Sequence, residues 1–252
     1  MSNAHEPGRE ADEQVTSPPC ERLDWDSTFF GLAIARAKAS TFAADDWPAV
    51  REWCVQQRIA CLYVLAKSGD STTTRTLEEA GAHLVDVRVT LTGMLSRGAI
   101  EPQASVRPAG ETDISTLRDI AGRAHADTRF FADGRFDESR CRELYRTWIE
   151  KSCRGWSDQV LVAERDARPV GYISLHRGPA NEGRIGLVGV APEWRERGVG
   201  RALVQDGLRW LADQGMTKAS VPTQGGNVAS QRLYQSVGLR TADIAIWYHC
   251  WF

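Results

Sequence analysis

The sequence of 252 residues has no apolar run near the roughly 18 to 20 residues that a membrane-spanning helix needs. It also has no excess of basic residues, since 31 Lys and Arg face 33 Asp and Glu for a formal net charge of −2. A protein that binds nucleic acid usually presents a basic face, and none is indicated here. We therefore expect neither a membrane nor a nucleic acid as a partner.

Cysteine pairs of the C-x-x-C kind and histidine clusters at metal-ligand spacing are absent from the sequence. The six cysteines are scattered, which is typical of reduced, mostly buried thiols and not of a disulfide framework or a metal site. The N-terminus lacks the basic-then-apolar order of a signal peptide. These absences predict a cytoplasmic protein without a metal. The hydrophobic fraction of 42% and the charged fraction of 25% are ordinary for a globular enzyme.

Composition and periodicity divide the chain into parts. Residues 1–19 are polar, charged and Pro-containing, so they cannot bury enough apolar surface to become ordered, and a flexible tail is expected. Residues 20–98 alternate between strand and helix patterns, which predicts an N-terminal α/β half. A linker near 99–103 precedes residues 104–252, where the predicted order is strand, two helices, three strands, helix, strand, helix, strand. The N-terminal half could bind an acceptor, support the sheet or form a homodimer contact.

The most informative segment is RERGVGR at residues 195–201. It lies between an apolar strand pattern at 185–190 and an amphipathic helix pattern at 201–214. Glycines at alternate positions let successive backbone N–H groups point inward, and the start of the helix adds unpaired donors and the positive end of its dipole. A pyrophosphate fits such a turn. The Walker and dinucleotide-fold glycine patterns are absent. The alternative interpretation is an ordinary strand-to-helix turn with solvated arginines.

The spacing R-x-x-G-x-G resembles the acetyl-CoA signature of the GCN5-related N-acetyltransferase (GNAT) family. A second segment, NVASQRLYQSVGL at 227–239, is similar to the family pattern N-x-x-[AS]-x-x-x-Y-x-x-x-G-[FL]. The resemblance covers residues 104–252 and implies the mixed α/β fold of that family, here with an additional N-terminal α/β half. It also implies an acetyltransferase that uses acetyl-CoA as co-substrate and no metal.

Roles for particular residues follow from the resemblance. Asn227 would contact the pantetheine arm of CoA, and Tyr234 would protonate the leaving thiolate as a general acid. A core tyrosine is the alternative for Tyr234, and Tyr248 is the competing acid. The residues expected to bind acetyl-CoA are Val188, Gly189, Val190, Arg195, Glu196, Arg197, Gly198, Val199, Gly200, Arg201 and Asn227.

The strand at 184–190 has a further expected role, because family members open a gap beside it. Backbone N–H groups at Val188 and Val190 would then bind the thioester carbonyl and the pantetheine amides. Glycine is unusual inside a packed strand, so Gly186 and Gly189 indicate a bulge or a close approach to a ligand.

Two segments rich in aromatic and acidic residues, 23–31 and 125–133, resemble those of the TDP-fucosamine acetyltransferase group within the family. Those enzymes acetylate the 4-amino group of a dTDP-linked 4-amino-4,6-dideoxy sugar. The corresponding acceptor-binding candidates are Phe30, Asp127, Arg129 and Phe130. Each is equally compatible with a core position or, for the charged side chains, a surface salt bridge.

The sequence leaves the general base open between Asp127, Glu182, His176 and a water relay. The expected function is transfer of an acetyl group to the amine of a small molecule, with an amino sugar nucleotide as the first hypothesis. Alternatives are another small amine, a protein N-terminus, or a non-catalytic module that only binds acyl-CoA.

Overall fold

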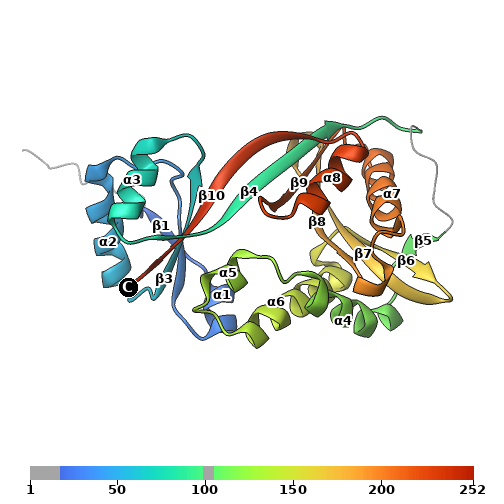
Figure 1. Cartoon of the computed structure of the whole chain (residues 1–252), viewed down its shortest axis with the longest axis horizontal. Helices are drawn as coiled ribbons and strands as arrows, with labels where there is room; N and C mark the ends of the chain where they lie inside the picture. Colours follow the sequence, from blue (N-terminus) through green and yellow to red (C-terminus); the bar gives the residue numbers. More distant parts are fainter. Residues whose placement is uncertain (1–17, 99–104) are drawn as a thin grey trace, which may run out of the picture.

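A computed structural model describes residues 18–98 and 105–252 (Figure 1). The flexible tail expected at 1–19 lies outside these residues except for its last two positions, and the expected linker at 99–103 lies outside them. The described chain forms one mixed, ten-stranded sheet in the order β1-β2-β3-β10-β4-β9-β8-β7-β6-β5. The predicted α/β class is therefore confirmed.

The strands are β1 (Cys20–Arg22), β2 (Ile34–Ala37), β3 (Cys61–Lys67), β4 (His83–Met94), β5 (Val106–Pro108), β6 (Gln159–Arg165), β7 (Arg168–Arg177), β8 (Glu182–Val190), β9 (Lys218–Gln224) and β10 (Arg240–Trp251). The helices are α1 (Asp24–Phe30), α2 (Trp47–Gln56), α3 (Ser71–Glu79), α4 (Ile114–Ala124), α5 (Arg129–Asp133), α6 (Glu138–Lys151), α7 (Val199–Asp213) and α8 (Val228–Ser236). Short 3₁₀ turns include one at Pro192–Trp194.

Three hydrophobic clusters hold the helices against the sheet. One joins α7 and α8 to strands β4 and β6–β9, and a second joins α1, α4, α5 and α6 to the opposite side of the sheet. The third packs α2 and α3 on strands β1–β3 and β10. The run CLYVLA in β3 is buried almost throughout because helices cover both faces of that strand, which explains its continuous apolar pattern.

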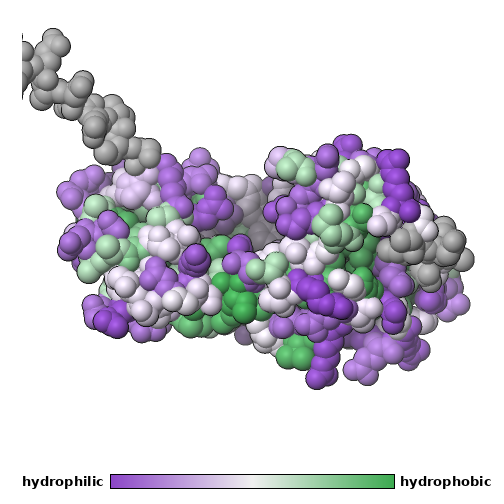
Figure 2. Space-filling view, turned by 90° about the horizontal axis from the view of Figure 1, so that it is seen from above, coloured by the Kyte–Doolittle hydropathy of each residue, from purple (hydrophilic) through white to green (hydrophobic). Residues whose placement is uncertain are grey.

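The two parts of the chain share this sheet. Strand β10 runs antiparallel between β3 and β4, with Tyr248 opposite Val64 and Ile246 opposite Val87. Strand β4 in turn pairs with β9, where Leu91 lies opposite Val221. Strands from before residue 98 and after residue 105 therefore alternate in the middle of the sheet. Seen from above, the surface is hollowed between the two ends of the molecule (Figure 2).

Most predicted elements are found within a few residues of their expected bounds, but three short ones were not predicted. These are β1, α1 and α5, each of seven residues or fewer. A helix of that length has no repeating 3.6-residue pattern to detect. No helix among the described residues is both long and apolar enough to cross a membrane.

Candidate active site

The site begins with two parallel strands that pair only briefly. Strands β8 and β9 are paired at Glu182–Arg184 and Lys218–Ser220, and their remaining residues separate. We call the region between residues 185–190 and 221–224 the strand gap. The N–H of Ala191 donates to the Val170 carbonyl of β7 at 2.9 Å. Backbone N–H directions alternate along a strand, so those of Val188 and Val190 point away from β7, toward the gap.

A β-bulge lies in β8 beside the gap, as predicted. The register with β7 shifts so that Gly186 and Leu187 together face Ser174, whose Oγ accepts a hydrogen bond from the Leu187 N–H at 2.8 Å. The glycine at 189 has a packing reason as well. A Cβ there would lie 2.6 Å from the ring of Tyr172, so only glycine lets that ring cover the strand.

The glycine turn leads from β8 into α7. Gly198 is the residue before the helix and has φ +79°, a left-handed conformation that favours glycine. The helix is 15 residues long, and its first backbone donors, at Val199, Gly200 and Arg201, have no intrahelical acceptor. Together with the exposed side chains of Arg195, Arg197 and Arg201, this geometry can hold an anion.

Helix α8 begins at the far side of the gap. The side chain of Asn227 accepts a hydrogen bond from the Ser230 N–H at 3.0 Å, so it caps the helix. The amide of Gln231 donates to the carbonyls of Gln224 and Gly225 at 3.1 and 2.9 Å, which fixes α8 to the end of β9.

Tyr234 is buried in the cluster to which Val188, Val190 and Val199 also belong. Helix α8 therefore packs in the same hydrophobic cluster as residues of the gap and of the start of α7. Burial raises the pKa of Tyr234 above its usual range, so the hydroxyl keeps its proton at neutral pH. Tyr248 lies in a different cluster, with α2 and α3.

The candidate general bases lie at different positions relative to the strand gap. Glu182 pairs with Lys218 at 3.5 Å, where β8 and β9 are still paired. The ring of His176 lies against Gly186 at the bulge, because a Cβ on Gly186 would be 2.9 Å from His176 Nε2. From Glu182 to Val190 an extended strand spans roughly 26 Å. This distance argues against Glu182, and Asp127 is exposed on the loop before α5.

Asp86 in β4 is a carboxylate that sequence reasoning missed. It lies opposite Trp247 of β10, close to the backbone of Gly225, the residue that directly follows β9 and whose N–H donates to the Val87 carbonyl at 2.5 Å. Burial raises the pKa of Asp86 to about 6, although the nearby backbone N–H groups of Val87 and Gly225 and the Arg129 charge oppose the shift. The signal available in the sequence was an acid inside the otherwise apolar stretch LVDVRV.

His125 was also missed, and it lies on the other side of the gap. Its Nε2 is hydrogen bonded to the Tyr172 hydroxyl at 2.8 Å, and its ring stacks on Tyr145 with centroids 4.6 Å apart. Burial lowers the pKa of His125 to about 4, so the ring is neutral at pH 7. Because the Tyr172 ring covers Gly189, the hydrogen bond from His125 to Tyr172 helps to hold that ring against β8.

The acceptor-binding candidates divide into two groups. Phe130 is 2% exposed and stacks on Phe30 with ring centroids 5.6 Å apart, so both contribute mainly to the core. Arg129 lies between aromatic rings, and its charge acts on Asp86.

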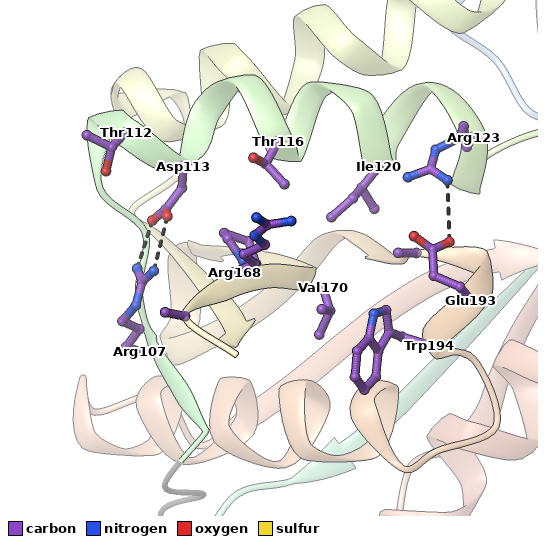
Figure 3. Close-up of a pocket in the computed structure, with 13 residues that line it drawn as sticks. Arg107, Thr112, Asp113, Thr116, Ile120, Arg123, Arg168, Val170, Glu193 and Trp194 are labelled. Atoms are coloured by element: carbon purple, nitrogen blue, oxygen red, sulfur yellow. Dashed lines mark hydrogen bonds and ion pairs between the residues drawn. The ribbon is translucent and has the colours of Figure 1, made fainter. Parts of the chain in front are cut away.

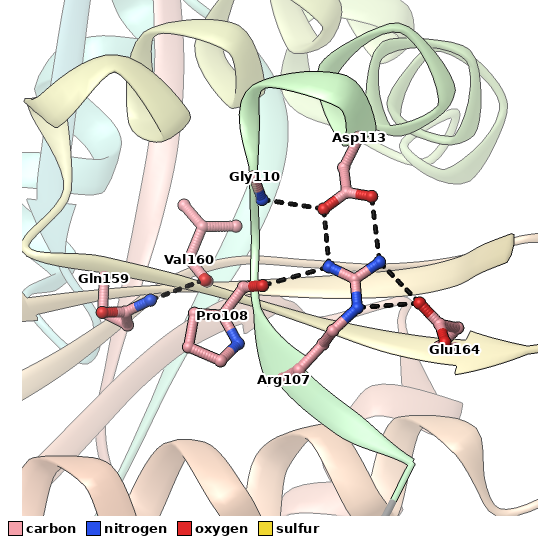
Figure 4. Close-up of polar contacts among 7 residues, drawn as sticks. All are labelled: Arg107, Pro108, Gly110, Asp113, Gln159, Val160 and Glu164. Carbon is pink, nitrogen blue, oxygen red and sulfur yellow. Dashed lines mark hydrogen bonds and ion pairs between the residues drawn. The ribbon is translucent and has the colours of Figure 1, made fainter. Parts of the chain in front are cut away.

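A separate cavity of about 670 Å³ lies between α4, the turn from β6 to β7, and the 3₁₀ turn at Pro192–Trp194 (Figure 3). Its lining includes no residue of β9 or α8, so it is outside the strand gap. Its Arg107 binds Asp113 at 2.7 and 3.1 Å and Glu164 at 2.7 Å, which ties β5 to β6 (Figure 4). Arg123, which also lines the cavity, forms an ion pair with Glu193 at 3.4 Å. Carboxylates of the protein therefore already pair with both arginines.

Comparison with known proteins identifies the family. The sequence model of the Acetyltransferase (GNAT) family matches residues 123–239. The chain is 32% identical over 237 residues to dTDP-fucosamine acetyltransferase of Escherichia coli O6:H1, covering 90% of this chain and 96% of that protein. The chain belongs to the GNAT acetyltransferase family. It is therefore an acetyltransferase, and enzymes of this family use acetyl-CoA.

Two further relatives are more distant. A mycothiol acetyltransferase of Nocardiopsis dassonvillei is 42% identical over 66 residues, which cover 26% of this chain and 20% of that one. The solved structure of a GCN5-related N-acetyltransferase from Kribbella flavida superimposes with a TM-score of 0.62 at 16% identity, covering 94% of this chain and 89% of that one. The similarity to this solved structure includes the N-terminal strands as well as the GNAT core.

Within residues 18–98 and 105–252, no group of three or more His, Cys, Asp or Glu side chains is arranged to hold a metal ion.

The glycine turn gives the first prediction. Gly198→Asp is expected to weaken acetyl-CoA binding at least about 100-fold, because a carboxylate about 4 Å from a phosphate costs on the order of 4 kcal/mol near a protein surface. Titration calorimetry with acetyl-CoA measures the loss. Gly81→Asp is the matched control, since Gly81 has a similar φ of +76° and open space around it but lies in the N-terminal half. Unchanged affinity in folded Gly198→Asp protein would exclude this anion site.

Proposed function

We propose that this GNAT enzyme transfers the acetyl group of acetyl-CoA to a primary amine, the 4-amino group of a dTDP-linked amino-deoxy sugar. The observation that supports this acceptor best is the similarity to dTDP-fucosamine acetyltransferase, which extends over 90% of the chain and so includes the N-terminal strands as well as the GNAT core. The acceptor is then a small molecule, and the N-terminal half contributes to its site.

In the proposed complex, the pyrophosphate of CoA binds at the start of α7, where Arg195, Arg197 and the first helical N–H groups converge. The pantetheine arm follows the strand gap toward Val188 and Val190. Their N–H groups can donate to the pantetheine amides and to the thioester oxygen, which becomes an oxyanion when the amine attacks. Holding amine and thioester together supplies the proximity advantage without a covalent enzyme intermediate.

Proton transfers complete the proposed reaction. The amine nitrogen forms a bond to the acetyl carbon, and the carbon–sulfur bond breaks. Asp86 accepts the proton that the amine loses, and Tyr234 gives its hydroxyl proton to the leaving thiolate. A pKa of about 6 suits Asp86 to this role, because the group is mostly ionised at pH 7 yet still accepts a proton.

A panel of acceptors tests the proposed substrate. Thiol release from acetyl-CoA is measured with dTDP-linked 4-amino-4,6-dideoxy sugars, with the corresponding free amino sugars, with simple amines and with peptides bearing a free N-terminus. We expect the dTDP-linked sugars to have the highest kcat/KM. If a small amine or peptide reacts and the sugar nucleotides do not, the acceptor assignment is wrong. Acetyl-CoA binding without turnover on any amine would instead favour a non-catalytic module.

Tyr234→Phe removes one hydroxyl and keeps the ring in the core. If Tyr234 protonates the thiolate, kcat should fall by roughly 10²-fold, while KM for acetyl-CoA and the unfolding temperature should change little. Steady-state kinetics with pre-steady-state confirmation that chemistry limits the rate checks this. Tyr248→Phe is the matched control, because Tyr248 is equally buried but packs with α2 and α3. A Tyr234→Phe enzyme with wild-type kcat would remove this residue from the mechanism.

Asp86→Asn tests the base through pH. A carboxyl group with a pKa of about 6 is protonated below that pH and cannot accept a proton, so kcat/KM of the wild type should rise with pH through about 6. In Asp86→Asn this rise should be lost and the plateau should fall by roughly 10²-fold. Asp243→Asn, which changes an exposed carboxylate on the neighbouring strand, should keep the wild-type profile. An unchanged profile in Asp86→Asn would contradict the assignment.

A further inference from the structure

The guanidinium of Arg129 is enclosed by aromatic rings. Its central carbon lies 4.1 Å from the ring centroid of Tyr63, 4.3 Å from that of Trp247 and 4.4 Å from that of Phe130. Three rings from β3, β10 and α5 therefore hold one cation on the side of the sheet that faces α5. Cation–π contacts favour the charge, but they satisfy none of its N–H donors.

A neutral histidine connects this cation to a distant carboxylate. Arg129 Nη1 donates to His249 Nε2 at 3.0 Å, so Nε2 is the unprotonated nitrogen. His249 Nδ1 must then carry the hydrogen, which it donates to Asp133, and the indole of Trp251 donates to the same carboxylate at 3.1 Å. Burial lowers the pKa of His249, which keeps the ring neutral. Asp133, His249 and Arg129 thus form a relayed ion pair that fixes the orientation of the guanidinium.

Most of the donors on Arg129 remain available. A guanidinium has five N–H groups, and within the described part of the chain the only hydrogen bond or ion pair of Arg129 is the one with His249. No carboxylate is within salt-bridge distance of it in these residues. Beside it, the hydroxyl of Tyr63 is buried without a hydrogen-bond partner, in a residue that is 1% exposed. Arg129 is half-buried, so these donors are accessible to a ligand, whereas a buried hydroxyl without a partner is costly unless a ligand supplies an acceptor.

We propose that Arg129, with the Tyr63 hydroxyl beside it, binds the diphosphate of the nucleotide-linked acceptor, and that Asp133 and His249 are positioning residues for it. This inference rests on the proposed function, because it names the group by which the same acceptor would be recognised. A diphosphate offers several charged oxygens that match the planar fork of an arginine, and the aromatic cage holds that fork in one orientation.

The position of Arg129 relative to Asp86 suits a sugar nucleotide. The positive charge of Arg129 is close enough to influence the titration of Asp86 in β4 and of Asp26 in α1. An amino sugar nucleotide has its amine on one side of the pyranose ring and its diphosphate on the other. With the amine at Asp86 and the strand gap, the diphosphate can reach toward Arg129. This site is distinct from the start of α7, where the pyrophosphate of CoA is proposed to bind.

The experiment measures binding of dTDP, thymidine and inorganic pyrophosphate by calorimetry, and KM for the dTDP-amino sugar and for acetyl-CoA by kinetics. Arg129→Met keeps a long apolar stem among the rings and removes all donors. We expect it to weaken dTDP and pyrophosphate binding and to raise KM for the sugar nucleotide by about 10- to 100-fold, with KM for acetyl-CoA unchanged. Arg135→Met is the matched control, because Arg135 also lies over an aromatic ring, Trp251, but is exposed.

Further variants keep the test decisive if Arg129→Met does not fold. Arg129→Lys retains the charge without the fork and should lose part of the affinity for dTDP. Asp133→Asn retains the shape of the side chain but not its charge, so it should raise KM for the sugar nucleotide while kcat and KM for acetyl-CoA stay near wild type.

The outcomes separate this inference from the proposed function. If the dTDP-amino sugar is acetylated with an unchanged KM by folded Arg129→Met or Arg129→Lys, the diphosphate site is wrong and the function stands. If no amino sugar nucleotide reacts but dTDP and pyrophosphate still bind in an Arg129-dependent way, the anion site stands and the acceptor is another phosphorylated amine. Wild-type protein that binds neither dTDP nor pyrophosphate would overturn the inference.

Discussion

The parallel pairing between β8 and β9 ends after Arg184 and Ser220, and the positions of the other functional groups depend on this early end. A fully paired β8 would use its backbone donors in the sheet. Because the strands separate, the N–H groups of Val188 and Val190 face an opening, and the chain leaves β8 for α7 at one edge of it. Helix α8 leaves β9 at the other edge. The early end of the β8–β9 pairing thus places backbone donors, the start of α7 and helix α8 with its buried tyrosine around the strand gap.

The sheet then connects this space to groups from the N-terminal half. Asp86 lies on β4, beside the end of β9, and Tyr63 lies on β3 beyond β10. Strand β4 holds β9, which is one side of the gap, and both β3 and β4 contribute to the region where we place the acceptor. The GNAT core therefore supplies the groups proposed for acetyl-CoA, while the N-terminal strands and α5 supply the groups proposed for the amine and its diphosphate.

The sequence predicted the features that depend on local geometry. The glycine turn, the bulge in β8 and the helix that follows Asn227 each depend on residues close together in the chain. Asp86 was missed, because its proximity to Gly225 arises from pairing between strands that are distant in sequence. The distance of Glu182 from the gap could not be predicted for a similar reason, because nothing in the sequence showed which end of β8 stays paired. The short helices α1 and α5 had no periodic pattern to predict them.

The place of β10 between β3 and β4 has a consequence for how the chain folds. Strands β3 and β4 are close in sequence but do not pair with each other. Each pairs instead with β10 (Arg240–Trp251), which lies between them. During synthesis, the edges of β3 and β4 remain unpaired while the whole GNAT core is being made. Pairing of this kind joins segments far apart in the chain, which slows folding and leaves strand edges open to other chains. The hydrogen bonds that unite the two halves can form only late.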